Sequence, residues 1–194
     1  MENIASQIVH WIKTYAENAR VKGLVIGISG GVDSAVVSTL CARTGLPTLC
    51  LEMPIHQAES HVSRAEEHIA FLKAHYPNVS NLRTDLTPVF DQFVAQIPPT
   101  DKSTYEMALA NTRARLRMTT LYYFAGLEGY IVVGTGNKIE DFGVGFFTKY
   151  GDGGVDISPI ADLMKSEVYK LGEYLQIPQS ILKAKPSDGL FGDD

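Results

Sequence analysis

Cysteine is scarce in this sequence. Two cysteines in 194 residues are too few for the disulfide framework of a small secreted domain. Cys41 and Cys50 lack the C-x-x-C spacing of a redox motif, and each lies in an apolar segment. We therefore expect both to be small buried residues and the protein to work in a reducing compartment, the cytoplasm.

Long apolar runs and an excess of basic residues are also absent. No segment approaches the roughly 20 apolar residues of a membrane-spanning helix. The N-terminus, Met1-Glu2-Asn3, lacks the basic and then apolar layout of a signal peptide. Lys and Arg number 17 against 22 Asp and Glu, a formal net charge of -5. This balance argues against a general nucleic-acid binder, so we expect neither a membrane nor a nucleic acid among the partners.

The composition is that of an ordinary globular protein, with strand and helix patterns in alternation. At 45% hydrophobic and 20% charged residues, a chain of this length is typical of one domain, here 1–194. Apolar runs predict strands at 24–28, 48–53 and 130–133, and a shorter one at 79–84. Helical patterns occupy the N-terminus up to residue 22 and the segments 34–43, 58–75, 86–96, 104–124 and 165–174.

This alternation predicts an α/β fold, with a parallel sheet flanked by helices on both faces in a Rossmann-like arrangement of three layers. In such sheets, ligands bind beyond the carboxyl ends of the strands. The loops at 29–34, 54–57 and 134–141 each follow a predicted strand. We therefore expect these three loops to converge on one cleft.

The loop after the first predicted strand reads Ser29-Gly30-Gly31-Val32-Asp33-Ser34. Its glycines leave no Cβ in the way, so several N–H groups can point at one anion at the positive end of the following helix. The serines add hydroxyl donors, and the carboxylate of Asp33 suits Mg²⁺ better than phosphate. The Walker A lysine and the G-x-G-x-x-G spacing are both missing. SGGVDS instead resembles the pyrophosphate-binding loop of the N-type ATP pyrophosphatases, and an ordinary glycine-rich turn is the alternative.

Two further glycine-rich segments carry charged side chains. The segment 134–141 follows the strand at 130–133 and brings Glu140 and Asp141 to a strand end, where a carboxylate completes a Mg²⁺ site with Asp33. The segment 145–154 places one cation, Lys149, and one anion, Asp152, among four glycines. Such a segment is typical of backbone that packs closely against a ligand or folds tightly.

The ordered set SGGVDS, NTRARLRM (111–118), GTGNKIED (134–141), GFFTKYGDGG (145–154) and SPIADLMKSEV (158–168) resembles the ammonia-dependent NAD synthetases. The resemblance spans residues 24 to about 170. It implies an adenine-nucleotide alpha-hydrolase-like fold and a homodimer with the substrate site at the subunit interface. It also implies a ligase that adenylates the nicotinate carboxylate of nicotinic acid adenine dinucleotide with ATP, releases pyrophosphate, and forms NAD when ammonia displaces AMP.

The resemblance also implies roles for individual residues. Asp33 and Glu140 would ligate Mg²⁺, Asp152 would lie near the reacting nicotinoyl group, and Arg115 would contact the dinucleotide. Lys149 and Lys165 would neutralise charge on the leaving phosphates, because the carboxylate nucleophile and the triphosphate repel each other. Asp33, Lys149, Asp152 and Lys165 are thus the catalytic candidates, with Lys149 and Asp152 also in the substrate site. The ATP site would comprise Ser29, Gly30, Gly31, Val32, Asp33, Ser34, Thr135, Lys149 and Lys165.

The sequence departs from the family pattern in two places. The family normally continues beyond residues 186–194 into an acidic loop and a C-terminal helix, so we expect this chain to lack its C-terminal segment. Glu52, at the end of the second predicted strand, is an acid where a side chain that tolerates phosphate would be expected. We assign no role to it from the sequence.

Other functions remain open at this point. Another ATP pyrophosphatase of the same fold, GMP synthetase-like or tRNA-modifying, shares the loop. A tRNA-thiolating enzyme commonly has paired cysteines and a basic face, and GMP synthetase is not expected to carry GFFTKYGDGG. A non-catalytic adenine-nucleotide sensor needs neither two Mg²⁺ carboxylates nor the two lysines. Glutamine-dependent NAD synthetases add a large amidase domain, for which this chain has no room, so free ammonia is the expected nitrogen donor.

Overall fold

A four-stranded parallel sheet forms the centre of the protein. The computed structural model describes residues 1–184, except the side chain of Phe142. The strands are β1 (Gly23–Gly27), β2 (Thr48–Glu52), β3 (Val79–Arg83) and β4 (Tyr130–Val132), in the order β3-β2-β1-β4. All pairs are parallel. The strands β2 and β3 lie on one side of β1 and β4 lies on the other, so the direction in which successive strands are added reverses at β1.

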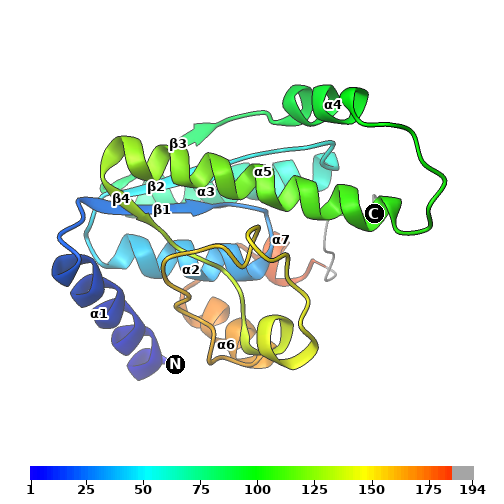
Figure 1. The fold of residues 1–194 in the computed structure, drawn as a ribbon. Coiled ribbons are helices and arrows are strands. Elements are labelled where there is room, and N and C mark those ends of the chain that lie inside the picture. Colours follow the sequence, from blue (N-terminus) through cyan, green and yellow to red (C-terminus); the bar gives the residue numbers. More distant parts are fainter. Residues whose placement is uncertain (185–194) are drawn as a thin grey trace.

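Helices connect the strands and cover both faces, as Figure 1 shows. The helices are α1 (Glu2–Asn18), α2 (Val32–Arg43), α3 (Glu59–His75), α4 (Thr87–Gln96), α5 (Tyr105–Glu128), α6 (Lys165–Tyr174) and α7 (Gln179–Leu182). A π-helix, η1 (Lys138–Val144), follows β4. None of the described helices is long and apolar enough to cross a membrane.

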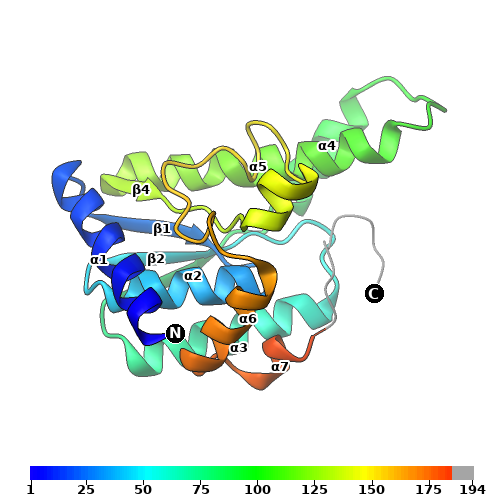
Figure 2. The same ribbon diagram turned by 90° about the horizontal axis from the view of Figure 1, so that it is seen from below.

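Alternate side chains of the strands pack into two separate hydrophobic cores, one on each face of the sheet. On one face, Leu24 and Ile26 of β1 pack with side chains of α1, α2, α3, α6 and α7. On the other face, Val25 packs with side chains of α4 and α5. Strand side chains alternate between faces, so a buried run such as residues 24–26 indicates a sheet covered on both sides. Figure 2 gives the view from the side of α1, α2 and α6.

The predicted α/β architecture with three layers is confirmed, and every predicted strand and helix is present within a few residues of its expected bounds. Two elements were not predicted. The loop expected at 134–141 contains η1, and the short helix α7 follows α6. The sequence prediction that the chain is cut inside a loop at 186–194 lies outside the described residues.

A buried polar contact joins α2 and α3 within the larger core. Ser38 Oγ donates to the carbonyl of Ala35, so it accepts from Nε2–H of His68 at 2.9 Å. Both side chains are fully buried, and Nδ1 of His68 has no hydrogen-bond partner among the described residues. Burial lowers the pKa of His68 to about 4, because a proton on Nδ1 would place an unpaired charge in the core.

This histidine should make folding stability fall with acidity. The unfolded chain binds the proton near pH 6.5 and the folded chain only near pH 4, so the stability present at neutral pH is lost as pH falls below 6.5. We expect the free energy of unfolding to drop by about 2 kcal/mol from pH 7 to pH 5 through this residue. Urea denaturation of wild type and His68→Phe should show it, with exposed His10→Gln as control. An equal pH dependence in wild type and His68→Phe would contradict the assignment.

Candidate functional site

Two adjoining cavities lie at the carboxyl ends of the strands. The first, of about 310 Å³, is lined mainly by apolar side chains from β2, α3, α5 and the segment after β4, and we call it the apolar cavity. The second, of about 380 Å³, surrounds residues 29–34, and we call it the loop cavity. Ser29, His61 and Thr135 line both. The predicted convergence of the loops at 29–34, 54–57 and 134–141 is confirmed, since all three contribute lining residues.

The SGGVDS loop forms a tight turn into the N-terminus of α2. Ser29 Oγ accepts from the N–H of Gly31 at 3.2 Å and lies 3.1 Å from Ser34 Oγ, whose hydroxyl donates to the Gly31 carbonyl at 3.0 Å. Gly31 is the N-cap of α2 and has no side chain with which to cap it. The first N–H groups of the helix therefore have no intrahelical acceptor, and they open toward the loop cavity as donors for an anion.

Gly30 is required by both its backbone angle and its surroundings. Its φ is +81°, in the region that L side chains rarely adopt. A Cβ at this position would lie 2.5 Å from the carbonyl oxygen of His61 in α3. The loop thus packs directly on the start of α3, and Arg64 of that helix donates to the Gly30 carbonyl at 3.4 Å. Gly31 is less constrained, since its φ is -92° and a Cβ would meet only Ser29 Oγ at 3.3 Å.

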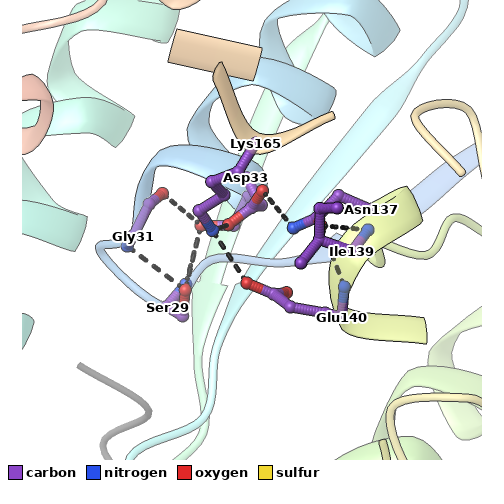
Figure 3. Close-up of polar contacts among 8 residues, drawn as sticks. Ser29, Gly31, Asp33, Asn137, Ile139, Glu140 and Lys165 are labelled. Atoms are coloured by element: carbon purple, nitrogen blue, oxygen red, sulfur yellow. Dashed lines mark hydrogen bonds and ion pairs between the residues drawn. The ribbon is translucent and has the colours of Figure 1, made fainter. Parts of the chain in front are cut away.

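Lys165 joins the two predicted carboxylates, as Figure 3 shows. Its Nζ forms an ion pair with Asp33 Oδ2 and donates to Glu140 Oε1 at 2.9 Å. Asp33 lies in the first turn of α2, Glu140 in η1, and Lys165 is the first residue of α6. Asp33 therefore meets two residues from a distant part of the sequence, one of them 132 positions away, at one point beside the SGGVDS loop.

Electrostatics in this cluster reflect burial as well as pairing. Burial raises the pKa of Asp33 more than the neighbouring Lys165 lowers it, and the charge of Glu140 raises it further. Burial acts to lower the pKa of Lys165, but its contacts with Asp33 and Glu140 outweigh burial and leave the pKa raised. Burial and repulsion from Asp152, Glu140 and Asp33 raise the pKa of Asp141. The site carries more negative than positive side chains and so favours an added cation.

Asn137 holds this arrangement in place and was missed in the sequence analysis. It is fully buried, and its Nδ2 donates to Asp33 Oδ1 at 3.0 Å. Its Oδ1 caps η1 by accepting the N–H groups of Ile139 and Glu140, both at 3.1 Å. An Asn just after a strand and glycines is a typical helix N-cap, a signal that would have predicted a helix there.

The remaining predicted residues divide between the cavity and the surface. Thr135 lines both cavities, and Asp152 lines the apolar cavity while its Oδ1 accepts the N–H of Thr148 at 2.9 Å. Lys149 lies outside both cavities, exposed, with its Nζ 5.1 Å from the ring centre of Tyr150. Arg115 is also exposed and donates to the Lys149 carbonyl at 3.2 Å. The described chain thus gathers Asp33, Glu140 and Lys165, but leaves Lys149 and Arg115 together on the surface.

Arg117 is a second residue whose importance the sequence did not reveal. It lines the apolar cavity and fastens α5 to the loop after β2, because it donates to the Met53 carbonyl at 3.1 Å and to Gln57 Oε1 at 2.9 Å. Burial and the nearby charge of Arg113 lower its pKa to about 10. Among the arginines of NTRARLRM, only Arg115 received a role from the sequence.

Comparison with known proteins agrees with this geometry. The family model described as NAD synthase matches residues 4–194. The chain belongs to the NAD synthase family. A curated NH(3)-dependent NAD(+) synthetase of Alkaliphilus metalliredigens is 42% identical over 189 residues, which cover 95% of this chain and 76% of the relative. Membership of this family makes the chain a ligase.

Two solved structures superpose closely on this chain. An NMN synthetase from Francisella tularensis gives a TM-score of 0.90 at 36% identity, covering 98% of this chain and 77% of its own. An NH3-dependent NAD synthetase from Campylobacter jejuni, in complex with the nitrate ion, gives 0.83 at 32% identity, covering 94% and 76%. The fold predicted from the strand and helix alternation is therefore the fold of this family.

The two glycines of the loop offer a matched pair of substitutions. Gly30→Ala should destabilise the fold by about 1–3 kcal/mol more than Gly31→Ala, because it adds strain at positive φ and a clash with the His61 carbonyl. Gly30→Ala should also weaken ATP binding, since the loop must shift. Chemical denaturation and calorimetric titration with ATP would measure both effects. Equal losses for the two variants would contradict this account of the loop.

Proposed function

We propose that this member of the NAD synthase family uses ATP and ammonia to amidate nicotinic acid adenine dinucleotide to NAD, with release of AMP and pyrophosphate. The observation that carries the proposal is the convergence of the SGGVDS loop, the Asp33 and Glu140 carboxylates and Lys165 beside one cavity. The curated relatives named NH(3)-dependent NAD(+) synthetase support the nitrogen donor and the product. We expect the reaction to take place in the cytoplasm.

The SGGVDS loop would hold the phosphates of ATP. Residues 29–34 offer hydroxyl and N–H donors at the N-terminus of α2, where anions are stabilised. The ammonium group of Lys165 would turn from the carboxylates to the phosphates and stabilise negative charge on the leaving pyrophosphate. Thr135, at the junction of the two cavities, is positioned to contact the nucleotide.

The residues present fit a magnesium ion. Asp33 and Glu140 come from different elements and direct one oxygen each at the same point, which the Lys165 ammonium group takes in this structure. The described residues contain no group of three or more His, Cys, Asp or Glu that could hold a metal, but Mg²⁺ needs only one or two carboxylates with phosphate oxygens and water. Bound there, Mg²⁺ would neutralise phosphate charge, while Asn137 keeps Asp33 oriented.

The nicotinate end of the dinucleotide would reach the ATP phosphates from the side of Asp152 and the segment 145–154. Asp152 lies at the edge of the apolar cavity, where its carboxylate would attract ammonium or accept a proton from it. Arg115 and Lys149, exposed beside each other, would bind the far part of the substrate. We propose a homodimer, since α4 and α5 leave large apolar side chains exposed for a partner: Val89, Phe93, Met107, Tyr123 and Leu127.

An assay that follows NAD and pyrophosphate together tests the proposed function. With ATP, Mg²⁺, ammonium and nicotinic acid adenine dinucleotide, we expect equal amounts of the two products. Pyrophosphate without NAD would mean that adenylation proceeds and amidation fails. If the assay yields neither product, the reaction is refuted for this chain. Another ATP pyrophosphatase or a sensor is then the better interpretation.

A second candidate is the same amidation of the mononucleotide. The Francisella tularensis structure, which gives the TM-score of 0.90, is titled NMN synthetase, and the two reactions differ only in the size of the nucleotide that carries the nicotinate carboxylate. The assay should therefore be run in parallel with nicotinic acid mononucleotide. A higher kcat/KM for the mononucleotide would assign this chain to NMN synthesis.

Substitution of Asp33 tests the metal site. Asp33→Asn keeps the shape and the contact with Asn137 but removes the charge that would bind Mg²⁺ and pair with Lys165. We expect Mg²⁺-dependent turnover to fall by about 100-fold or more with the fold intact by circular dichroism. Asp162→Asn, at an exposed position three residues before Lys165, is the matched control. An unchanged rate in Asp33→Asn would remove this residue from the site.

A further inference from the structure

The apolar cavity contains a buried acid that has no role in the proposal so far. Glu52 is the last residue of β2, lines the cavity and is only 7% exposed. Burial raises the pKa of Glu52, and the charge of Arg83 lowers it by less. A titratable group with a perturbed environment in a ligand cavity is a candidate functional residue.

Glu52 does not belong to a structural ion pair. Arg83 is the cation whose charge acts on the pKa of Glu52, but its side chain donates to Glu66 Oε1 at 2.7 Å instead. Within residues 1–184, no Lys, Arg or His side chain lies within ion-pairing distance of the Glu52 carboxylate. A buried carboxylate that is held without a cation is costly unless another donor satisfies it. The side chain of Asn81 gives Glu52 one hydrogen bond. A carboxylate can accept several hydrogen bonds, so a donor on a ligand in the cavity can supply another.

The position of Glu52 relative to the SGGVDS loop indicates which ligand. The N–H of Ile28 donates to the Leu51 carbonyl at 2.8 Å, so Glu52 lies beside the residue that precedes Ser29. The apolar cavity meets the loop cavity at Ser29, His61 and Thr135. If the triphosphate occupies the loop, as the proposed function requires, the nucleoside of ATP extends into the apolar cavity.

We propose that Glu52 is a specificity residue for the base of ATP, and that its carboxylate accepts a hydrogen bond from the 6-amino group of adenine. An ionised carboxylate can only accept, and adenine presents a donor at this position whereas a 6-oxo purine presents an acceptor. Met53, Val62 and Ala65 form the neighbouring wall of the cavity, which suits a flat apolar base better than a sugar. This inference rests on the proposed ATP site.

Binding of ATP and ITP in the absence of the pyridine nucleotide tests the inference. Titration calorimetry should show that wild type binds ATP at least about tenfold more tightly than ITP, since a mismatched acceptor leaves a buried group unpaired. In Glu52→Gln, the amide can both accept and donate, so the ratio should fall toward one. Glu59→Gln removes the same charge at an exposed position that lines neither cavity and should keep the wild-type ratio.

The outcomes separate this inference from the proposed function. Tight ATP binding with the same ATP-to-ITP ratio in wild type and Glu52→Gln would overturn the role of Glu52 alone. A different result would be that Glu52→Gln keeps its preference for ATP over ITP but loses the wild-type preference for ATP over 2′- or 3′-deoxy-ATP. That result would assign the carboxylate to the ribose and would also overturn its role at the base. A wild-type chain that binds neither nucleotide would overturn both proposals. If Glu52→Gln fails to fold, Glu52→Asp should weaken ATP binding and leave ITP binding unchanged.

Discussion

The contact of Lys165 with Asp33 and Glu140 is the interaction on which the site depends. It connects the starts of α2 and α6 to the π-helix η1, which are three separate segments of the sequence. Asn137 adds a neutral link between η1 and Asp33. Because these side chains are partly buried, the pairing is screened less than a surface ion pair would be, and it keeps two carboxylates close together that would otherwise repel each other.

The same contact relates the structure to the proposed ATP complex. In the structure, the ammonium group of Lys165 neutralises charge on the two carboxylates. In the proposed complex with ATP and Mg²⁺, Asp33 and Glu140 would hold the metal and the Lys165 ammonium group would turn to phosphate. Lys165 is half-buried with a long flexible stem, which allows this exchange without movement of α6.

The division of the ligand space into two cavities separates two kinds of chemistry. The loop cavity is formed by backbone and charged groups suited to phosphate, whereas the apolar cavity has a mainly apolar wall with a few polar groups, among them Glu52 and Arg117. Arg117 fixes the loop after β2 to α5, so the wall that would contact a base is held by a helix on the opposite face from α2. If the proposed ATP site is right, phosphate binding and base selection can therefore be altered separately.

Much of the protein follows from local sequence. The apolar runs and helical periodicities determined all four strands and six of the helices, because strand alternation and buried apolar stripes are local patterns. SGGVDS likewise determined the tight turn into α2, since Gly30 adopts a positive φ that few other residues tolerate. The carboxylates Asp33 and Glu140 were found as acids at strand ends, where parallel sheets place their ligands.

Only the tertiary structure decided which of these residues meet. The ion pairs of Lys165 span 132 and 25 positions, and no periodicity reports a contact across such distances. The structure also separated Lys149 and Arg115 from the cavities, and it placed Glu52 and Arg117, to which the sequence gave no role, in the wall of the apolar cavity. The physical reason is that local patterns set the conformation of each segment, whereas the burial, pairing and pKa of a charged side chain depend on what the packed fold places around it.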